Sequence, residues 1–145
     1  MTIVVYRNRI HLSSGIDNKI LGDEHMEYVK LFNAEYRVME IIWENEPLTS
    51  RALAEICLKE LDWQRTTTYT MLKKLSQKGY AQNENKIVSS LISKEEVQKR
   101  ESKDFVEKNF AGSLYSFIAA FTSDNVLDEE EIKKIQKLIR DYKKQ

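Results

Sequence analysis

The sequence has little cysteine, proline or glycine and no long apolar run, and each shortage excludes a class of protein. The single cysteine, Cys57, has no second cysteine with which to form an intramolecular disulfide or a cysteine metal site. One proline and four glycines are too few for the frequent turns of an all-β sandwich. Apolar runs such as 117–121 reach about five residues, whereas a membrane-spanning helix needs about 20. Without a signal peptide either, the sequence predicts no membrane insertion and a cytoplasmic location.

Net charge is also absent, because 23 basic side chains balance 23 acidic ones. A balanced total does not exclude nucleic-acid binding, since a basic face needs only a local excess of charge. One such excess is present between Trp63 and Tyr80, where four basic residues occur without an acidic one. This segment is the only local charge asymmetry in the sequence that indicates a partner.

Frequent lysine, glutamate and leucine favour helices, and the spacing of apolar residues predicts three helices in the first half of the chain. The first follows Asn33 as its N-cap and ends at Pro47. The second is capped by Thr49 or Ser50, and Cys57 falls on its apolar stripe, where a buried structural thiol is expected. The third covers about 65–77 and ends at Gly79.

Two short β-type stretches follow, 80–82 and 87–91, and the turn-forming residues 83–85 between them predict a hairpin. Leu48 is expected to be extended. Ser93 is expected to cap a helix that runs to a break near Gly112, and two more helices follow it. Three helices and then a hairpin are the order of a winged helix-turn-helix, so the predicted fold class is mainly α with a small β-hairpin wing.

The chain is accordingly divided into a winged-helix DNA-binding domain at 26–92 and a helical dimerisation region at 93–145. Residues 1–25 show no sustained period and little order is expected in them. The run at 22–25 before Met26 would be encoded by purine-rich codons, like a ribosome-binding site. Residues 1–25 are therefore either a flexible leader or the product of a mis-assigned start.

The third predicted helix has the residue types of a DNA-reading helix. A helix fits the major groove, where short side chains let its backbone approach base edges and cationic side chains neutralise phosphates. Threonine methyls can touch thymine, and threonine hydroxyls can bond bases or phosphates. Threonine-rich faces are also ordinary solvated surface, and winged helices also mediate protein contacts, so a dimeric adaptor without DNA binding is the alternative. The candidate DNA-binding residues are Arg65, Thr66, Thr67, Tyr69, Thr70, Lys73 and Lys74.

Two segments in this order and spacing resemble the penicillinase-repressor family, which includes methicillin-resistance and copper-responsive repressors. They are residues 33–43, NAEYRVMEIIW, and residues 62–75, DWQRTTTYTMLKKL, followed by Lys78 and Gly79. The resemblance runs from Leu31 to the C-terminus. It implies a homodimeric repressor with a winged helix that binds double-stranded operator DNA, and it places Lys86 in the wing beside the seven candidates above.

Three departures from the family pattern limit what the resemblance transfers. The hairpin is about three residues shorter than in the antibiotic-resistance members, which puts the wing contacts in doubt. Tyr69 stands where some members have arginine, so the operator sequence does not transfer. The copper-responsive members have a C-terminal cysteine cluster, and residues 133–145 contain no cysteine. A copper sensor of that design is excluded.

The C-terminal apolar residues form either the core of one chain or, as we expect for such short helices, a dimer seam. The candidate dimerisation residues are Phe105, Phe110, Phe117, Phe121, Ile135 and Leu138. In inducible family members a membrane-bound sensor peptidase triggers cleavage at an Asn-Phe bond. The aligned pair here is Asp104 and Phe105, and Asn109 precedes Phe110 five residues later. The resemblance therefore makes the sensor peptidase a candidate partner.

No enzyme signature is present. The two histidines, His11 and His25, both lie in the segment 1–25, and the sequence has no glycine-rich phosphate loop and no HExxH zinc motif. The paired acids Glu95 and Glu96 fall in the first turn of a helix, where the helix dipole accounts for them. We expect no catalytic residue, no cofactor and no metal site.

Overall fold

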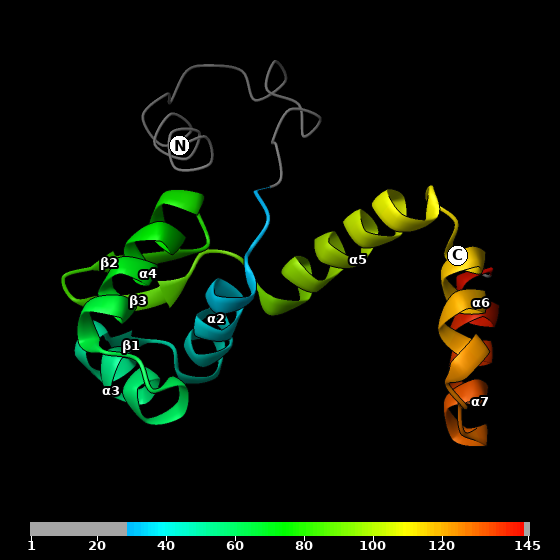
Figure 1. The fold of residues 1–145 in the computed structure, drawn as a ribbon, viewed down its shortest axis with the longest axis horizontal. Coiled ribbons are helices and arrows are strands. Elements are labelled where there is room, and N and C mark those ends of the chain that lie inside the picture. The colour runs from blue at the N-terminus through cyan, green and yellow to red at the C-terminus, as the bar shows by residue number, and fades with distance from the viewer. Residues whose placement is uncertain (1–28, 144–145) are drawn as a thin grey trace, which may run out of the picture. The chain divides into compact units, whose positions relative to one another are not determined.

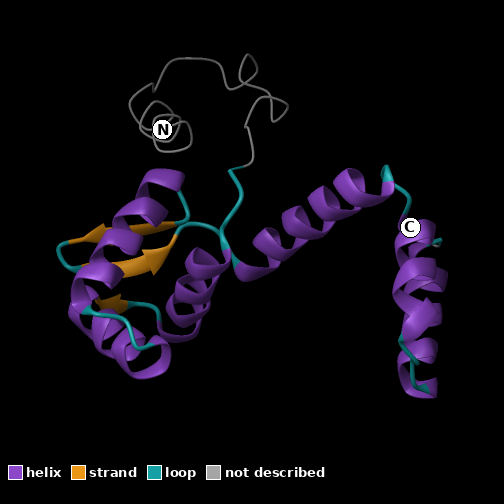
Figure 2. Ribbon diagram, viewed as in Figure 1, coloured by secondary structure: helices purple, strands orange, loops and turns teal. Residues whose placement is uncertain are grey.

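The computed structural model describes residues 29–143, which form two compact units, one ending at Glu101 and the other beginning at Ser102. The expectation that 1–25 is a leader or a mis-assigned start lies outside the described residues. Within them, no helix is both long enough and apolar enough to cross a membrane. The fold class is confirmed as mainly α with a small antiparallel sheet (Figures 1 and 2).

The first helix, α2 (Asn33–Asn45), begins one residue earlier than expected. Asn33 is not its N-cap; Phe32 occupies that position, and its N–H donates to the Glu35 carboxylate at 2.9 Å. This backward reach of an acidic side chain in the first turn satisfies an N–H that has no partner within the helix. The helix ends two residues before Pro47, because the proline ring disfavours the helical conformation at the preceding residue.

The next two helices match their local signals. Thr49 is the N-cap of α3 (Ser50–Leu61), and its hydroxyl accepts the Ala52 N–H at 3.0 Å. The third helix, α4 (Arg65–Lys78), ends at Gly79 with φ of 82°, a left-handed conformation that glycine adopts without a steric penalty. Both ends of α4 therefore agree with the sequence to within one residue.

The sheet has three antiparallel strands in the order β1-β3-β2, namely β1 (Leu48–Thr49), β2 (Ala81–Glu84) and β3 (Ile87–Ser90). The hairpin is confirmed, but its turn is at Asn85 and Lys86 rather than at 83–85. Both turn residues have positive φ, 51° and 65°, as in the two-residue turns that match the twist of paired strands. Asn83 and Glu84 are therefore free to pair with β3.

The core of the N-terminal unit lies between the three helices and the sheet. Its fully buried side chains include Val38, Met39, Ile42, Leu53, Cys57, Leu75 and Val88. Val97, in the first turn of α5 (Lys94–Phe110), is also fully buried and belongs to the same cluster. Cys57 is confirmed as a buried thiol. Burial raises the pKa of this thiol, and the neighbouring Thr68 side chain offsets only part of that effect.

The C-terminal unit consists of the end of α5, α6 (Leu114–Asp124) and α7 (Glu129–Tyr142). α5 breaks at Ala111 and Gly112, both with positive φ, as the glycine predicted. Ser93, Ser113 and Asp128 each accept an N–H of the helix that follows, at 3.1, 3.1 and 2.7 Å. No side chain of α6 or α7 is buried.

Candidate nucleic-acid interface

Helix α4 separates its residues into a buried side and an exposed side. Thr68, Leu72 and Leu75 face the core, where α4 packs against α3 and β2. The residues predicted to contact DNA are all exposed, namely Arg65, Thr66, Thr67, Tyr69, Thr70, Lys73 and Lys74. The helix thus presents its hydroxyl and cationic side chains to solvent while its apolar stripe holds it in the fold.

The cations of α4 differ in their surroundings. Within residues 29–143, Arg65, Lys73 and Lys74 form no ion pair, so their charges are available to an anionic partner. Lys78 is different, because its Nζ lies 2.6 Å from Oε2 of Glu35 and its side chain is only 18% exposed. Of the four basic residues counted in this segment of the sequence, three remain free and one is neutralised inside the protein.

Lys86 lies exposed at the tip of the wing, in a left-handed conformation that a residue with a Cβ rarely adopts. Its carbonyl oxygen accepts the N–H of Ser50, the first residue of α3, at 2.9 Å. The sequence did not reveal this link between the wing tip and the start of α3. The Asn-Lys dipeptide was the available signal for the turn, since asparagine tolerates positive φ.

Two further contacts fix the base of the wing, and both were missed from the sequence. The Glu46 carboxylate accepts the backbone N–H of Ser90 and, at 2.9 Å, its hydroxyl. The Trp43 indole N–H donates to the carbonyl oxygen of Ile92 at 3.0 Å. Both partners are more than 40 residues away in sequence, so no local pattern could have identified them.

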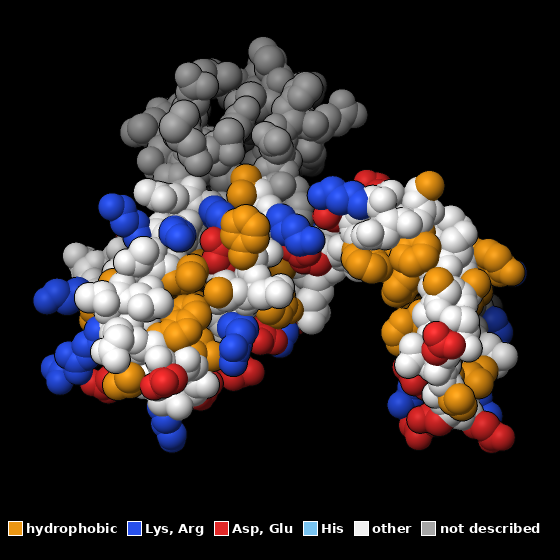
Figure 3. All heavy atoms as spheres, in the orientation of Figure 1, with side chains coloured by type: hydrophobic (Ala, Val, Ile, Leu, Met, Phe, Trp, Pro, Cys, Tyr) orange, Lys and Arg blue, Asp and Glu red, His pale blue; other side chains and the backbone are white. Residues whose placement is uncertain are grey.

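The candidate dimerisation residues divide into two groups. Phe105, Phe110 and Phe117 form an aromatic cluster within one chain, with ring centroids 5.5 to 6.0 Å apart. Phe121 contacts Phe117 at 6.1 Å but remains 51% exposed. In α7, Ile135 is half-buried and Leu138 is 70% exposed. Figure 3 shows the hydrophobic side chains that gather on the surface of the C-terminal unit.

Both candidate cleavage bonds lie inside α5. The Asp104 carboxylate pairs with Lys108 at 3.0 Å, and the Phe105 ring belongs to the aromatic cluster. The Asn109 side-chain amide donates to the carbonyl oxygen of Phe105 at 3.0 Å. Neither bond is in an extended loop, so a protease would have to unwind the helix locally before cutting.

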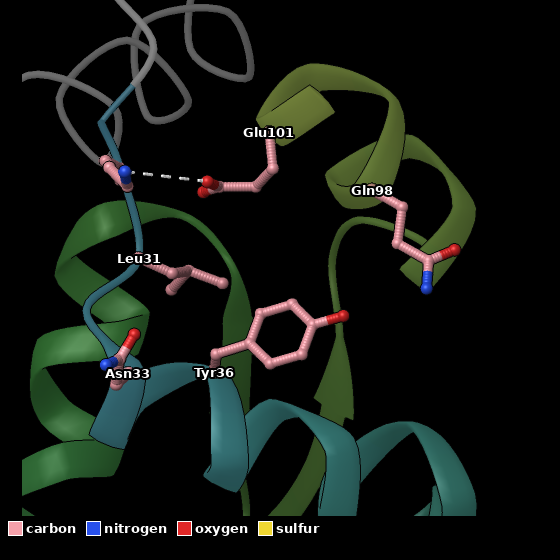
Figure 4. Close-up of a pocket in the computed structure, with 6 residues that line it drawn as sticks. Leu31, Asn33, Tyr36, Gln98 and Glu101 are labelled. Carbon is pink, nitrogen blue, oxygen red and sulfur yellow. Dashed lines mark ion pairs between the residues drawn. The ribbon is translucent and has the colours of Figure 1, made fainter. Parts of the chain in front are cut away.

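A separate hollow of about 340 Å³ lies in the N-terminal unit (Figure 4). It is lined by Lys30, Leu31, Asn33, Tyr36, Gln98 and Glu101, and the dashed line marks the Lys30–Glu101 ion pair at 4.0 Å. None of these residues belongs to α4 or to the wing, so the hollow is not part of the candidate interface. Among residues 29–143, no three His, Cys, Asp or Glu side chains are grouped to hold a metal ion.

Comparison with known proteins shows which proteins this chain is similar to in sequence. The methicillin resistance regulatory protein MecI of Staphylococcus aureus (strain N315) is 26% identical over 114 residues, covering 76% of this chain and 93% of its own. The penicillinase repressor of Bacillus licheniformis is 25% identical over 119 residues, covering 79% and 92%. The solved structure of the transcriptional regulator SlyA aligns over 97% of this chain and 87% of its own at 19% identity, but its TM-score of 0.37 is too low to support an assignment. Residues 31–141 match the penicillinase repressor family, and the chain belongs to that family.

Proposed function

We propose that this chain is a sequence-specific DNA-binding repressor that acts in the cytoplasm as a homodimer on a pseudo-palindromic operator. One relative is named as a regulatory protein and the other as a repressor, and neither is named as an enzyme, in agreement with the expectation that no catalysis occurs. The operator, its target genes and the protein's own second copy are the partners in this proposal.

One observation carries the proposal. Helix α4 exposes hydroxyl and cationic side chains on a surface that has no acidic residue, while Thr68, Leu72 and Leu75 anchor its other side. Such a helix can enter the major groove, with Thr66, Thr67, Tyr69 and Thr70 near base edges. Arg65, Lys73 and Lys74 would contact phosphates, which position the protein without reading sequence.

The wing supports the same role. Lys86 is held at positive φ in a two-residue turn where glycine is the favoured residue, at a cost of about 1–2 kcal/mol. Strained residues of this kind cluster at functional sites. Phosphate contact by Lys86 would be such a function.

The dimer is proposed from the exposed apolar side chains of α6 and α7. Phe121 and Leu138 present large apolar surfaces that their own chain does not cover, and a second copy would remove them from water. Phe105, Phe110, Phe117 and Ile135 would support this seam from within each subunit. Two-fold symmetry of the protein would then be mirrored by two operator half-sites.

The test is binding to the DNA upstream of the gene, compared with random DNA of the same length. If a dimer neutralises about 6–10 phosphates, log affinity falls against log salt with a slope of about −5 to −9. Thr70→Ala should reduce the preference for the operator, whereas Lys74→Ala should weaken both duplexes about equally. A dimer that binds neither duplex would favour the adaptor function instead.

Release of repression by proteolysis is a second proposal, favoured by the position of two candidate bonds in α5. Cutting at Asp104–Phe105 or Asn109–Phe110 would separate the winged-helix domain from the dimerisation region and reduce the avidity for the operator by about 10² or more. A membrane sensor peptidase would initiate the cut. Mass spectrometry of the protein from induced cells tests this: fragments ending at Asp104 or Asn109 are expected, and an intact chain that leaves its operator contradicts it.

A further inference from the structure

The Lys78 ammonium at the end of α4 is surrounded by partners from outside that helix. Its Nζ donates to Oε2 of Glu35 at 2.6 Å and to the carbonyl oxygen of Lys30 at 3.1 Å. It also lies 4.4 Å from the centroid of the Phe32 ring, a cation–π distance. These three partners all come from the beginning of the described chain, 43 residues or more before Lys78.

The same segment is fastened by two more hydrogen bonds. We name residues 29–32 the strap. The Tyr80 hydroxyl donates to the carbonyl oxygen of Val29 at 2.6 Å, and the Phe32 N–H donates to the Glu35 carboxylate at 2.9 Å. One carboxylate thus accepts from the strap and from the end of α4 at once, and it is almost completely buried, at 4% side-chain exposure.

This geometry decides between two roles for Lys78. A lysine that contacts phosphate must present its ammonium to solvent, as Lys73 and Lys74 do. The charge of Lys78 is instead compensated at 2.6 Å by a buried acid, so it adds little to the field of the DNA-facing surface. Its position at the C-terminal turn of α4 does place it where a small displacement would tilt the whole helix.

We infer that Glu35, Lys78 and the strap form a clamp that sets the orientation of α4 for reading DNA, and that Lys78 is a positioning residue rather than a phosphate contact. This inference rests on the proposed DNA-binding function. The clamp joins the first turn of α2 to the last turn of α4. When it is intact, the threonines of α4 meet base edges at the required angle; when it is released, phosphate contacts persist but base contacts are lost.

The experiment compares full-length variants by fluorescence anisotropy on the upstream operator fragment and on random DNA, over a range of about 50 to 200 mM salt. The variants are Lys78→Met and Glu35→Gln, with Lys74→Met as the matched control on the same helix. All are measured at a temperature where circular dichroism shows them fully folded.

Lys78→Met should reduce operator affinity about tenfold or more, because the displaced threonines of α4 lose their base contacts. Affinity for random DNA should change little, and the salt slope should not change. Lys74→Met should weaken both duplexes and make the slope shallower by about 0.9 per copy. Glu35→Gln distinguishes the roles by the sign of its effect. Freeing a phosphate-contacting lysine would raise affinity, whereas loosening a clamp lowers it.

Two further variants keep the test decisive if Glu35→Gln fails to fold. Lys78→Arg preserves the ion pair and should retain operator preference, and the double variant Glu35→Gln/Lys78→Met should lose no more preference than the worse single variant. A shallower salt slope for Lys78→Met, or higher affinity for Glu35→Gln, would overturn the clamp. Absence of salt-dependent binding by the unaltered protein would instead overturn the proposed function.

Discussion

The indole N–H of Trp43 donates a 3.0 Å hydrogen bond to the carbonyl oxygen of Ile92, which joins α2 to the segment between the wing and α5. Replacing Trp43 with phenylalanine removes the donor and leaves the carbonyl oxygen without this partner. We expect the free energy of unfolding to fall by about 1–3 kcal/mol. Urea titration followed by circular dichroism measures the change. The control is Glu44→Gln at the exposed neighbouring position, which should stay within about 0.5 kcal/mol of the unaltered protein.

A second prediction separates stability from binding at the wing tip. Lys86→Gly relieves the positive φ and should stabilise the protein by about 0.5–1 kcal/mol, because glycine is favoured at this position of the turn. The same change removes a proposed phosphate contact on each subunit, so DNA binding should weaken and its salt slope should become shallower by about 0.9 per copy. Thermal unfolding and anisotropy measure the two effects. Unchanged DNA affinity would show that the wing lysine has no contact with DNA.

The third prediction concerns pH. Because burial raises the pKa of the Cys57 thiol, the folded protein retains the thiol proton at a pH where the unfolded chain has lost it. The stabilisation from this thiol is therefore complete below its ordinary pKa, about 8.5, and is lost as the pH rises through the folded value. Stability should fall more steeply above about pH 9 in the unaltered protein than in Cys57→Ala. Equal slopes would contradict the prediction, and slow reaction of the native thiol with a disulfide reagent, accelerated by urea, is the accompanying check.

The fourth prediction tests the dimer seam at a residue that its own chain barely covers. Leu138→Ser removes an apolar side chain from both copies and should raise the dimer dissociation constant by about 10² or more. Lys137→Ser, one position earlier on the charged side of α7, has a similar effect on helix propensity and serves as the control. Sedimentation equilibrium measures both. If Leu138→Ser remains as dimeric as Lys137→Ser, the seam lies elsewhere.

Local signals made much of the fold predictable. Thr49 and Ser93 cap their helices with their own hydroxyls, and Gly79 ends α4 with its own backbone conformation, so each boundary depends on a few adjacent residues. The exposed side of α4 followed from its period. These features require no knowledge of which distant segments meet.

The features that could not be predicted depend on distant partners. Lys78 is one of the four basic residues that give the segment from Trp63 to Tyr80 its excess of charge, and the acid that compensates it, Glu35, precedes it by 43 residues. Asn33 looked like the cap of α2 because its type is common there, but the Glu35 carboxylate already satisfies the N–H of Phe32. The wing turn begins two residues later than predicted because cross-strand pairing with Ile87 and Val88 extends β2 through Glu84.

The pairing of β1 with β3 affects how much conformational entropy the wing would lose on binding DNA. Leu48 pairs with Val88, and the Ser50 N–H donates to the carbonyl oxygen of Lys86, so the part of the hairpin nearest its tip is paired with the residues that lead into α3. A wing held in this way is preorganised: it does not have to order itself as it approaches a duplex, and the associated loss of conformational freedom has already occurred during folding. The flexibility that remains is in the Lys86 side chain at the wing tip. That side chain would have to adjust to a phosphate whose position varies from one DNA sequence to the next.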